Sequence, residues 1–266
     1  MISFNYLGNL GRLANQMFQY ASLMGIASNR EMEYCIPPKH VFGKFDSLVK
    51  SSDTNLYECF DINPQNIGIT DYKIRQESSF AFDKNLFNFC EDRTNINGYL
   101  QTEKYFKHIK DDIKKQFSFK SEILEPSKSK FEEFFSGSEV ISLHIRRGDY
   151  IVNPNHPVQS LDYYKNSLDL LDKNFPVLIV SDDPKWCNRQ SIFDDDRFFV
   201  SDLGNTNVDL CLMSLCNYHI IANSSFSWWG SWLANSKKTI APKNWFGGDC
   251  INHNTDDLYC SDWIIL

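Results

Sequence analysis

The sequence predicts an α/β fold in which doubly wound parallel sheets carry helices on both faces. From Val140 onward, short apolar runs alternate with segments of helical period. The clearest run, Val140 to His144, has the pattern of a buried strand, and the chain then turns through Arg146-Arg147-Gly148-Asp149. Near the start of the chain, a short apolar stretch passes through a glycine-containing loop into a helix. These three observations are typical of parallel strands joined by crossover helices.

The first predicted strand is Ile2–Tyr6, and a loop with Gly8 and Gly11 follows it. Apolar residues then recur at helical spacing as far as Asn29, which predicts a helix after the loop. A helix N-terminus in such a place directs N–H groups at a ligand and can bind an anion. The two glycines do not have the spacing of the dinucleotide fingerprint, and the Gly-Lys-Ser/Thr of a P-loop is missing.

The rest of the N-terminal half is less regular. We expect a second strand at Glu33–Ile36, and loops, short helices and a lid over residues 37–95, where no period is sustained. Gly98–Gln101 is predicted as a short strand that leads into a helix over residues 102–117.

The domain boundary is expected after a polar segment that contains Pro126. The predicted domains are residues 1–136 and 137–266, and the final residues of the second are free to pack back on the first. The second domain is predicted to alternate in this order: strand 140–145, helix 160–173, strand 177–180, a short helix after Pro184, strand 197–200, helix 208–216, strand 219–222, helix 225–235 and strand 239–241.

Composition argues against several classes of protein. The 266 residues carry a formal net charge of −7, so nucleic acid is not the expected partner. No run reaches the roughly 18 apolar residues of a membrane span, and we expect no integral membrane segment. The eight cysteines lack metal-ligand spacing, and no secretory signal is visible. We therefore expect reduced thiols, no zinc site and a cytoplasmic protein.

Two stretches favour binding of a phosphate group. Arg146 and Arg147 follow a buried strand, where ligands of open α/β sheets bind, and a guanidinium pair suits a diphosphate. Gly148 permits a tight turn there, and His144 is placed to line the same cleft as Arg146. The alternative is a salt-bridged surface turn. The second stretch, Asn223-Ser224-Ser225, crowds polar groups where a strand meets a helix.

The second stretch also has a simpler explanation, because one serine could merely cap the helix. Three polar residues in a row favour a second phosphate-contacting loop instead. The tryptophans that follow, Trp228, Trp229 and Trp232, are expected in the core.

Asp182-Asp183, after another strand, is open to two interpretations. It is similar to the Asp-x-Asp that holds a divalent metal in some sugar transferases, but adjacent acids point in alternating directions. A strand-end turn in which Asp182 caps the next helix is the favoured interpretation. Arg147-Gly148-Asp149 also spells a cell-adhesion tripeptide, which its place at a buried strand end argues against.

Together, several motifs resemble those of the bacterial α-1,2-fucosyltransferases of glycosyltransferase family 11. The motifs cover Gly11 to Ala21, Gly98 to Phe106, His144 to Tyr150, Ser181 to Asp183 and Ile221 to Gly230. The resemblance implies a GT-B-like fold, with two Rossmann-type doubly wound domains facing a cleft. It also implies GDP-fucose as the donor, inversion at the anomeric carbon, and no cofactor or metal.

The wider fucosyltransferase superfamily implies roles for single residues. Carried over by motif position, His144 and Asp209 contact guanine, Arg146 holds the β-phosphate, and Asn15 lies near the donor. By the same carry-over, Ser224, Ser225 and Phe226 form the loop that binds the pyrophosphate. Arg147, Asn223 and Arg12 are the further residues expected to contact the donor. Many family members carry His-Gly-Val-Cys where this chain has His156-Pro157-Val158-Gln159, a departure that affects the acceptor contacts.

In the expected mechanism, the Arg146 guanidinium replaces a divalent cation and offsets charge on the departing β-phosphate. Asp149 is the first candidate for the base that deprotonates the acceptor, although it could instead brace an arginine. His156 and Glu103 are the next candidates, and some relatives need no conventional base.

The expected function is α-1,2 transfer of L-fucose to a galactose-containing oligosaccharide or lipid-linked glycan in bacterial surface-glycan synthesis. The enzyme would be free in the cytoplasm or peripheral at the inner membrane. The alternatives are another linkage such as α-1,3, a metal-dependent transferase that uses Asp182 and Asp183, and a carbohydrate-binding or adhesion module without chemistry.

Overall fold

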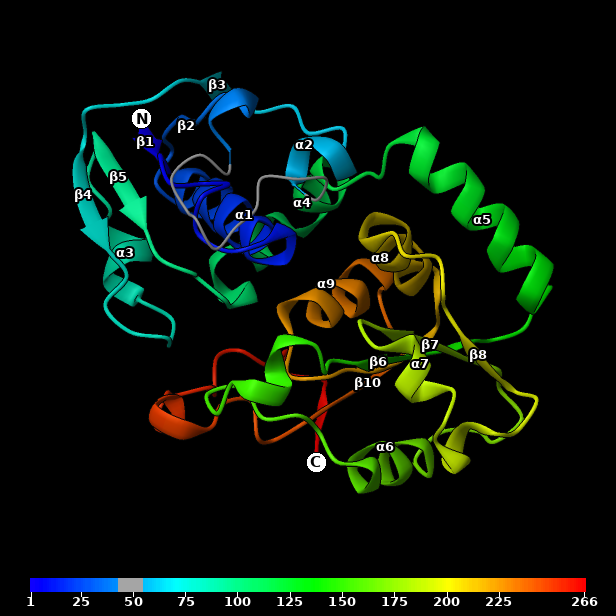
Figure 1. The fold of residues 1–266 in the computed structure, drawn as a ribbon. Helices are drawn as coiled ribbons and strands as arrows, with labels where there is room; N and C mark the ends of the chain where they lie inside the picture. The colour runs from blue at the N-terminus through cyan, green and yellow to red at the C-terminus, as the bar shows by residue number, and fades with distance from the viewer. Residues whose placement is uncertain (43–54) are drawn as a thin grey trace. The chain divides into compact units, whose positions relative to one another are not determined.

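The computed structural model of the chain describes residues 1–42 and 55–266 (Figure 1). They form two compact units: unit 1 is Met1–Lys120 with His253–Cys260, and unit 2 is Ser121–Asn252 with Ser261–Leu266. The division falls before the expected boundary at residue 136, because helix α5 (Ser121–Phe135) packs on helix α8 (Thr206–Leu215) of unit 2. Part of the expected lid, residues 43–54, lies outside the described residues.

Unit 1 contains a parallel sheet in the order β3-β2-β1-β5-β4. The order places β1 at the centre of the sheet, with β5 as a neighbour although nearly a hundred residues separate them. The strands are β1 (Ile2–Ser3), β2 (Tyr34–Ile36), β3 (Asn66–Ile67), β4 (Lys73–Gln76) and β5 (Thr94–Asn97). The helices are α1 (Leu13–Asn29), α2 (Leu56–Cys59), α3 (Lys84–Phe89) and α4 (Lys110–Gln116), with 3₁₀ turns at Lys39–Val41, Glu103–Tyr105 and Lys107–Ile109.

The prediction of a strand at Gly98–Gln101 was wrong. The strand is β5, which ends at Asn97, and the motif forms the loop after it. Gly98 has φ +157° and Leu100 has φ +51°, and neither value fits a strand. The single helix expected over 102–117 is instead two 3₁₀ turns followed by α4.

A segment near the C-terminus, His253–Cys260, belongs to unit 1. Asp257 forms an ion pair with Lys104 and accepts the backbone N–H of Phe82 at 2.8 Å. The ring of His253 stacks on that of Phe80, with centroids 5.7 Å apart.

Unit 2 contains a second parallel sheet, in the order β8-β7-β6-β9-β10-β11. In chain order within the unit this is 3-2-1-4-5-6, the strand order of a Rossmann fold. The strands are β6 (Ile141–Ile145), β7 (Val177–Ser181), β8 (Phe198–Val200), β9 (Tyr218–Ile220), β10 (Lys238–Ala241) and β11 (Ile264–Ile265). The helices are α5, α6 (Leu161–Leu168), α7 (Pro184–Cys187), α8 (Thr206–Leu215) and α9 (Ser225–Ala234), with 3₁₀ turns at Asp149–Val152, Ser191–Phe193 and Gly248–Cys250.

Strand β6 shows why the sheet is buried on both sides. Its five residues are all buried, and Ile141, Leu143 and Ile145 pack in one core cluster with residues of α6. A second cluster joins Leu178 and Val180 of β7 to α8. Side chains alternate along a strand, so His144 points to the opposite side from the α6 cluster. The tryptophans of α9 are buried, as expected.

Two further observations concern expected features. All eight cysteines are free thiols; seven are buried and Cys250 is partly exposed. Within the described ranges, no helix is both long and apolar enough to cross a bilayer.

Candidate functional site

The strand order of unit 2 brings the two predicted phosphate loops together. Strands β6 and β9 are adjacent in the sheet, but the chain continues from them toward opposite edges. Ligands of open α/β sheets bind at this switch point, beyond the carboxyl ends of the strands. The turn after β6 carries the arginines, and the turn after β9 begins α9. The Tyr150 hydroxyl links the two turns by donating to the Asn223 carbonyl at 3.1 Å.

Arg146 is held by two carboxylates and an aromatic ring. Its guanidinium pairs with Asp149, and its Nη1 lies 2.9 Å from Asp182 Oδ2. Its Cζ lies 5.2 Å from the centre of the Tyr150 ring. The side chain keeps 20% of its surface exposed. The guanidinium is therefore fixed at the strand tip while part of it stays open to a ligand.

Arg147 takes a different direction from Arg146. Its Nε lies 3.2 Å from Asp183 Oδ2, and its Cζ lies 4.0 Å from the centre of the Trp186 ring. Asp183 and Trp186 both come from the segment after β7. The expected guanidinium pair is thus divided between two supports, and Arg147 is the more closely packed against a protein ring.

The two aspartates after β7 both contact the turn that carries Arg146 and Arg147. Asp182 accepts the Arg147 backbone N–H through Oδ1 at 2.8 Å, in addition to its contact with Arg146. A Cβ on Gly148 would lie 2.5 Å from Asp182 Oδ2, which explains the glycine. The expectation that Asp182 caps the next helix was wrong: Asp183 accepts the Trp186 N–H at 3.1 Å and is the cap of α7. Groups of three or more metal-ligating side chains are not found among the described residues.

His144 and Phe226 lie together on one side of the sheet. Their ring centres are 5.6 Å apart. His144 is 4% exposed, and its Nδ1 has no hydrogen-bond partner among the described residues. Burial, and then the nearby Arg146 charge, lowers the pKa of His144 to about 3. A neutral imidazole with an unused ring nitrogen can take part in a hydrogen bond to a ligand.

Asp209, the other predicted guanine contact, lies in the first turn of α8. It accepts the Ser201 hydroxyl at 2.7 Å, just after β8, and β7 lies between β8 and β6. Burial raises the pKa of Asp209, and the Ser201 hydrogen bond opposes that effect. His144 and Asp209 therefore approach the carboxyl edge of the sheet from different strand ends.

The turn after β9 combines helix capping with buried polar groups. Ser224 accepts the Phe226 N–H at 3.3 Å and caps α9, as the simpler interpretation predicted. Asn223 is 1% exposed and donates through Nδ2 to the carbonyls of Pro157 and Trp245, each at 3.0 Å. Its Oδ1 has no partner among the described residues. Ser225 is the first residue of α9 and is partly exposed.

Of the two base candidates, Asp149 contacts Arg146 directly, and His156 lies against Tyr150, whose ring also faces Arg146. Asp149 forms the ion pair with Arg146, so it braces the arginine. His156 stacks on the Tyr150 ring, with centres 5.0 Å apart and an 18° angle between the rings. Burial lowers the pKa of His156, Asp149 raises it and Arg146 lowers it further. Tyr150 thus stands between Arg146 and His156.

The other predicted residues, Arg12, Asn15 and Glu103, belong to unit 1. Arg12 is exposed and precedes the first turn of α1. Asn15 lies within that turn and accepts a hydrogen bond from Gln101 Nε2 at 2.7 Å. Glu103 pairs with Lys107 at 3.0 Å.

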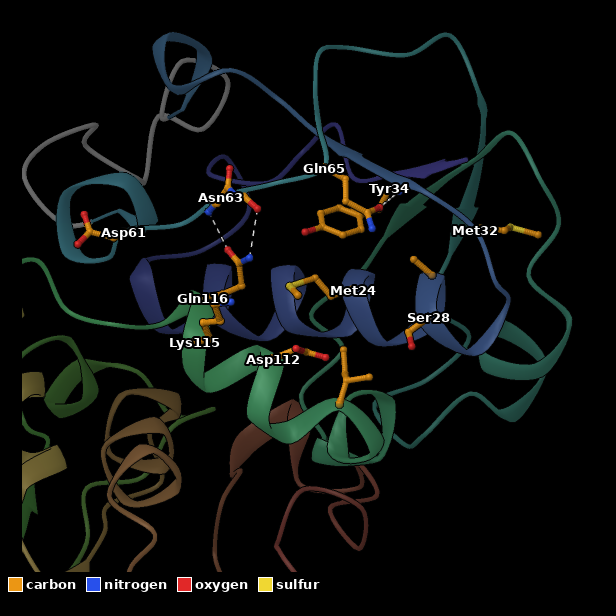
Figure 2. Close-up of a pocket in the computed structure, with 12 residues that line it drawn as sticks. Met24, Ser28, Met32, Tyr34, Asp61, Asn63, Gln65, Asp112, Lys115 and Gln116 are labelled. Atoms are coloured by element: carbon orange, nitrogen blue, oxygen red, sulfur yellow. Dashed lines mark hydrogen bonds between the residues drawn. The ribbon is translucent and has the colours of Figure 1, made fainter.

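A cavity of about 470 Å³ lies elsewhere in unit 1, between the C-terminal half of α1 and α4 (Figure 2). It is not lined by the predicted site residues. Two of its amide side chains bond within the protein: Gln116 accepts the N–H of Asn63 and donates to its carbonyl, and Gln65 accepts the Tyr34 N–H.

Sequence reasoning assigned no role to Tyr150, Trp186 or Gln101. Tyr150 and Gln101 each stand inside a quoted motif, so the motif itself was the available signal. Trp186 follows the aspartate pair, and no local pattern indicated that it would lie over an arginine.

The family model of glycosyl transferase family 11 matches residues 4–266. An alpha-1,2-colitosyltransferase of Escherichia coli is 38% identical over 169 residues, 58% of this chain and 57% of that protein. The O-antigen biosynthesis glycosyltransferase WbnK of Escherichia coli is 37% identical over 136 residues, 47% of this chain and 44% of that protein. The chain thus spans about half the length of these two relatives.

A more distant relative is galactoside alpha-(1,2)-fucosyltransferase 2 of Bos taurus, 24% identical over 248 residues, 86% of this chain and 68% of that protein. Among solved structures, fucosyltransferase NodZ from Bradyrhizobium matches with TM-score 0.55 and 14% identity, over 86% of this chain and 91% of that one. POFUT1 in complex with GDP matches with TM-score 0.53 and 12% identity, over 88% and 94%.

These structural likenesses show the fold, which is GT-B-like in having two parallel-sheet α/β domains. The match to the family model covers almost the whole sequence. The chain belongs to glycosyl transferase family 11.

Proposed function

We propose that the chain transfers L-fucose from GDP-fucose to a galactoside hydroxyl in bacterial surface-glycan synthesis. The reaction forms an α-1,2 linkage, inverts the anomeric carbon and requires no metal. The acceptor is a galactose-containing oligosaccharide or lipid-linked glycan. One observation carries the proposal: a partly open guanidinium follows β6, and its turn is hydrogen-bonded to the turn that begins α9 at the switch point of unit 2.

In the proposed reaction, the acceptor oxygen attacks the anomeric carbon of fucose. The bond from that carbon to the β-phosphate oxygen breaks, and its electron pair leaves with GDP. Arg146 bears the charge that develops on this phosphate, as a divalent ion does in other transferases. The N–H groups at the start of α9, beside Ser224 and Ser225, bind the pyrophosphate.

The remaining donor contacts follow the same arrangement. In this proposal, His144 forms a hydrogen bond to guanine through Nδ1, which has no partner within the described part of the chain. Asp209, in the first turn of α8, forms a second hydrogen bond to the base. Phe226, which packs on His144, encloses that side of the nucleotide. Asn223 supports the pyrophosphate loop by tying it to Pro157 and Trp245. In unit 1, Asn15 and Arg12 act on the donor from the start of α1.

The attacking hydroxyl of the acceptor sugar must lose its proton to a base. The ion pair with Arg146 favours a bracing role for Asp149. His156 is the better base, because burial lowers its pKa and keeps the imidazole neutral. Arg147 has a structural role in this proposal, since its guanidinium contacts the Asp183 carboxylate and the Trp186 ring.

A second donor follows from one comparison. The 38% identical relative is named a colitosyltransferase, so the colitose donor is a second candidate beside GDP-fucose. Both donors fit the α-1,2 linkage that the printed names of this relative and of the bovine enzyme share. Linkage and donor are therefore tested together.

The purified protein would be incubated with GDP-fucose, or with the colitose donor, and a panel of β-galactosides. Linkage would be determined by NMR, with and without EDTA. We expect an α-1,2 fucosyl product in both conditions, and a loss of roughly 100- to 1,000-fold in kcat for Arg146→Ala. Arg146→Lys should recover little activity, because lysine lacks the two-pronged contact.

Each alternative has its own result in the same experiment. An α-1,3 product would replace the proposed linkage, and a requirement for a divalent ion would refute metal independence. A protein that binds the galactosides but neither transfers nor hydrolyses the donor would be a binding module. Near-normal turnover by Arg146→Ala would remove the central role of that residue.

A further inference from the structure

Two sequence motifs of unit 1 meet through one side-chain hydrogen bond. Gln101 Nε2 donates to Asn15 Oδ1 at 2.7 Å. Asn15 lies in the first turn of α1, after β1, and Gln101 ends the loop after β5. Because β1 and β5 are neighbours, the segments that follow them meet at the carboxyl edge of the sheet. Along the chain, β2 follows β1 on one side of it in the sheet, whereas β5 is reached from β4 and lies on the other side of β1.

The loop that carries Gln101 is itself held at several points. Glu77, directly after β4, accepts the N–H groups of Tyr99 and Leu100 at 2.9 and 3.2 Å. The Leu100 carbonyl accepts the Ser22 hydroxyl of α1 at 3.2 Å. The loop is thus hydrogen-bonded both to the residue after β4 and to α1. These contacts fix the position of the Gln101 backbone relative to α1.

Asn15 is confined on another side by Gly11. Gly11 has φ +85°, and a Cβ at that position would overlap the Asn15 amide nitrogen. The amide therefore has its oxygen toward Gln101 and its nitrogen against the glycine. Gln101 and Gly11 together restrict the orientation of the Asn15 side-chain amide.

We propose that Gln101 is a positioning residue that holds the Asn15 amide in the orientation required for sugar transfer. The inference rests on the proposed function, in which Asn15 acts on the donor. Gln101 acts through Asn15, because its amide N–H ends on the Asn15 oxygen.

Two substitutions remove the donated hydrogen bond in different ways. Gln101→Glu keeps the shape, but a carboxylate only accepts hydrogen bonds, so the Asn15 amide must turn around to meet it. Gln101→Met keeps the approximate length and makes no such bond. We expect each to lower kcat roughly 10- to 100-fold, with a smaller change in the KM for GDP-fucose.

A matched control is available in the same sheet. Gln76 Oε1 accepts from Asn97 Nδ2 at 2.8 Å between β4 and β5. Gln76→Glu introduces the same charge, but it keeps the accepting oxygen and should leave kcat close to that of the unmodified protein.

A double-mutant cycle with Asn15→Ala separates positioning from general structural damage. If Gln101 acts through Asn15, then Gln101→Glu and Gln101→Met lower kcat less than twofold once Asn15 is alanine. Equal losses in both backgrounds would overturn the proposal. Urea unfolding of the same variants establishes that each is folded and whether the two positions are coupled.

Failure of the proposal and failure of the proposed function look different. If the unmodified protein transfers fucose but the effects of the Gln101 substitutions and of Asn15→Ala on kcat are additive, the positioning role of Gln101 is refuted and the proposed function stands. If the unmodified protein transfers no fucose to any acceptor, the proposed function fails, and the positioning role in transfer falls with it.

Discussion

Asp182→Asn is the most discriminating single substitution at the arginine turn. Asp182 contacts the turn twice, at the Arg147 N–H (2.8 Å) and at Arg146 Nη1 (2.9 Å). Asparagine keeps one accepting oxygen for the N–H, but it brings an N–H₂ group toward the guanidinium. The substitution therefore removes the charge-assisted contact with Arg146 and preserves most of the shape.

The size of the effect follows from that contact. A hydrogen bond to a charged group contributes about 1.5–3 kcal/mol. The two side chains are 20% and 24% exposed, and Asp149 still holds Arg146, so water and the second carboxylate reduce the loss. We take roughly 1–2 kcal/mol, which is a fall of about 5- to 30-fold in kcat. This is smaller than the roughly 2.7–4 kcal/mol expected when a transition-state donor is removed entirely.

The assay is GDP release and product formation at saturating GDP-fucose and acceptor, with and without EDTA. Asp183→Asn is the matched control, because asparagine caps a helix as well as aspartate does and the Asp183 carboxylate contacts Arg147 and the Trp186 N–H of α7, not Arg146. If the two aspartates held a metal, both variants would lose activity and EDTA would abolish that of the unmodified protein. Unchanged kcat in Asp182→Asn, or an equal loss in Asp183→Asn, would refute the bracing role.

The remaining predictions concern one glycine and two acids. Gly148→Ala should cost about 1–3 kcal/mol in urea unfolding and lower kcat at least as much as Asp182→Asn, since its Cβ would meet the Asp182 carboxylate at 2.5 Å; normal activity would contradict this. Burial raises the pKa of Glu77 from 4.5 to about 7, so the native state binds the proton more tightly than the unfolded chain does. Its contribution to stability therefore falls as pH rises from about 4.5 to 7, by on the order of 3 kcal/mol, and Glu77→Gln should remove that slope from the pH dependence of unfolding; parallel curves would count against it. Asp149→Asn should reduce kcat and keep the acidic limb of the pH–rate profile if Asp149 braces Arg146, whereas loss of that limb would identify it as the base.

Local patterns predicted much of unit 2 because each of its signals is contained in a short segment. The apolar run before Arg146 was predicted as a buried strand, and it forms the fully buried strand β6. Ser224, which directly precedes α9, caps that helix. Element ends were less accurate, as in the helix expected to reach residue 173 that stops at Leu168. In unit 1, Gly98–Gln101 was wrongly predicted as a strand, because nothing in its local sequence indicates the positive φ angles of Gly98 and Leu100.

The partners of the site residues could not be predicted in the same way. Asp182 and Asp183 were read as a metal pair or a simple turn, and the structure pairs each with an arginine. These contacts depend on β6 lying beside β7, as the link between Tyr150 and Asn223 depends on β6 lying beside β9.

The sequence alone therefore determined the α/β class, the family and the residues that stand at the ends of the strands. Periodicity and motif content are local properties, and they survive without knowledge of the fold. Only the tertiary structure decided which strand ends are neighbours, and hence that the turn with Arg146 meets the turn that begins α9 and that Asn15 contacts Gln101. Strand order is a property of contacts between distant residues, and no local pattern encodes it.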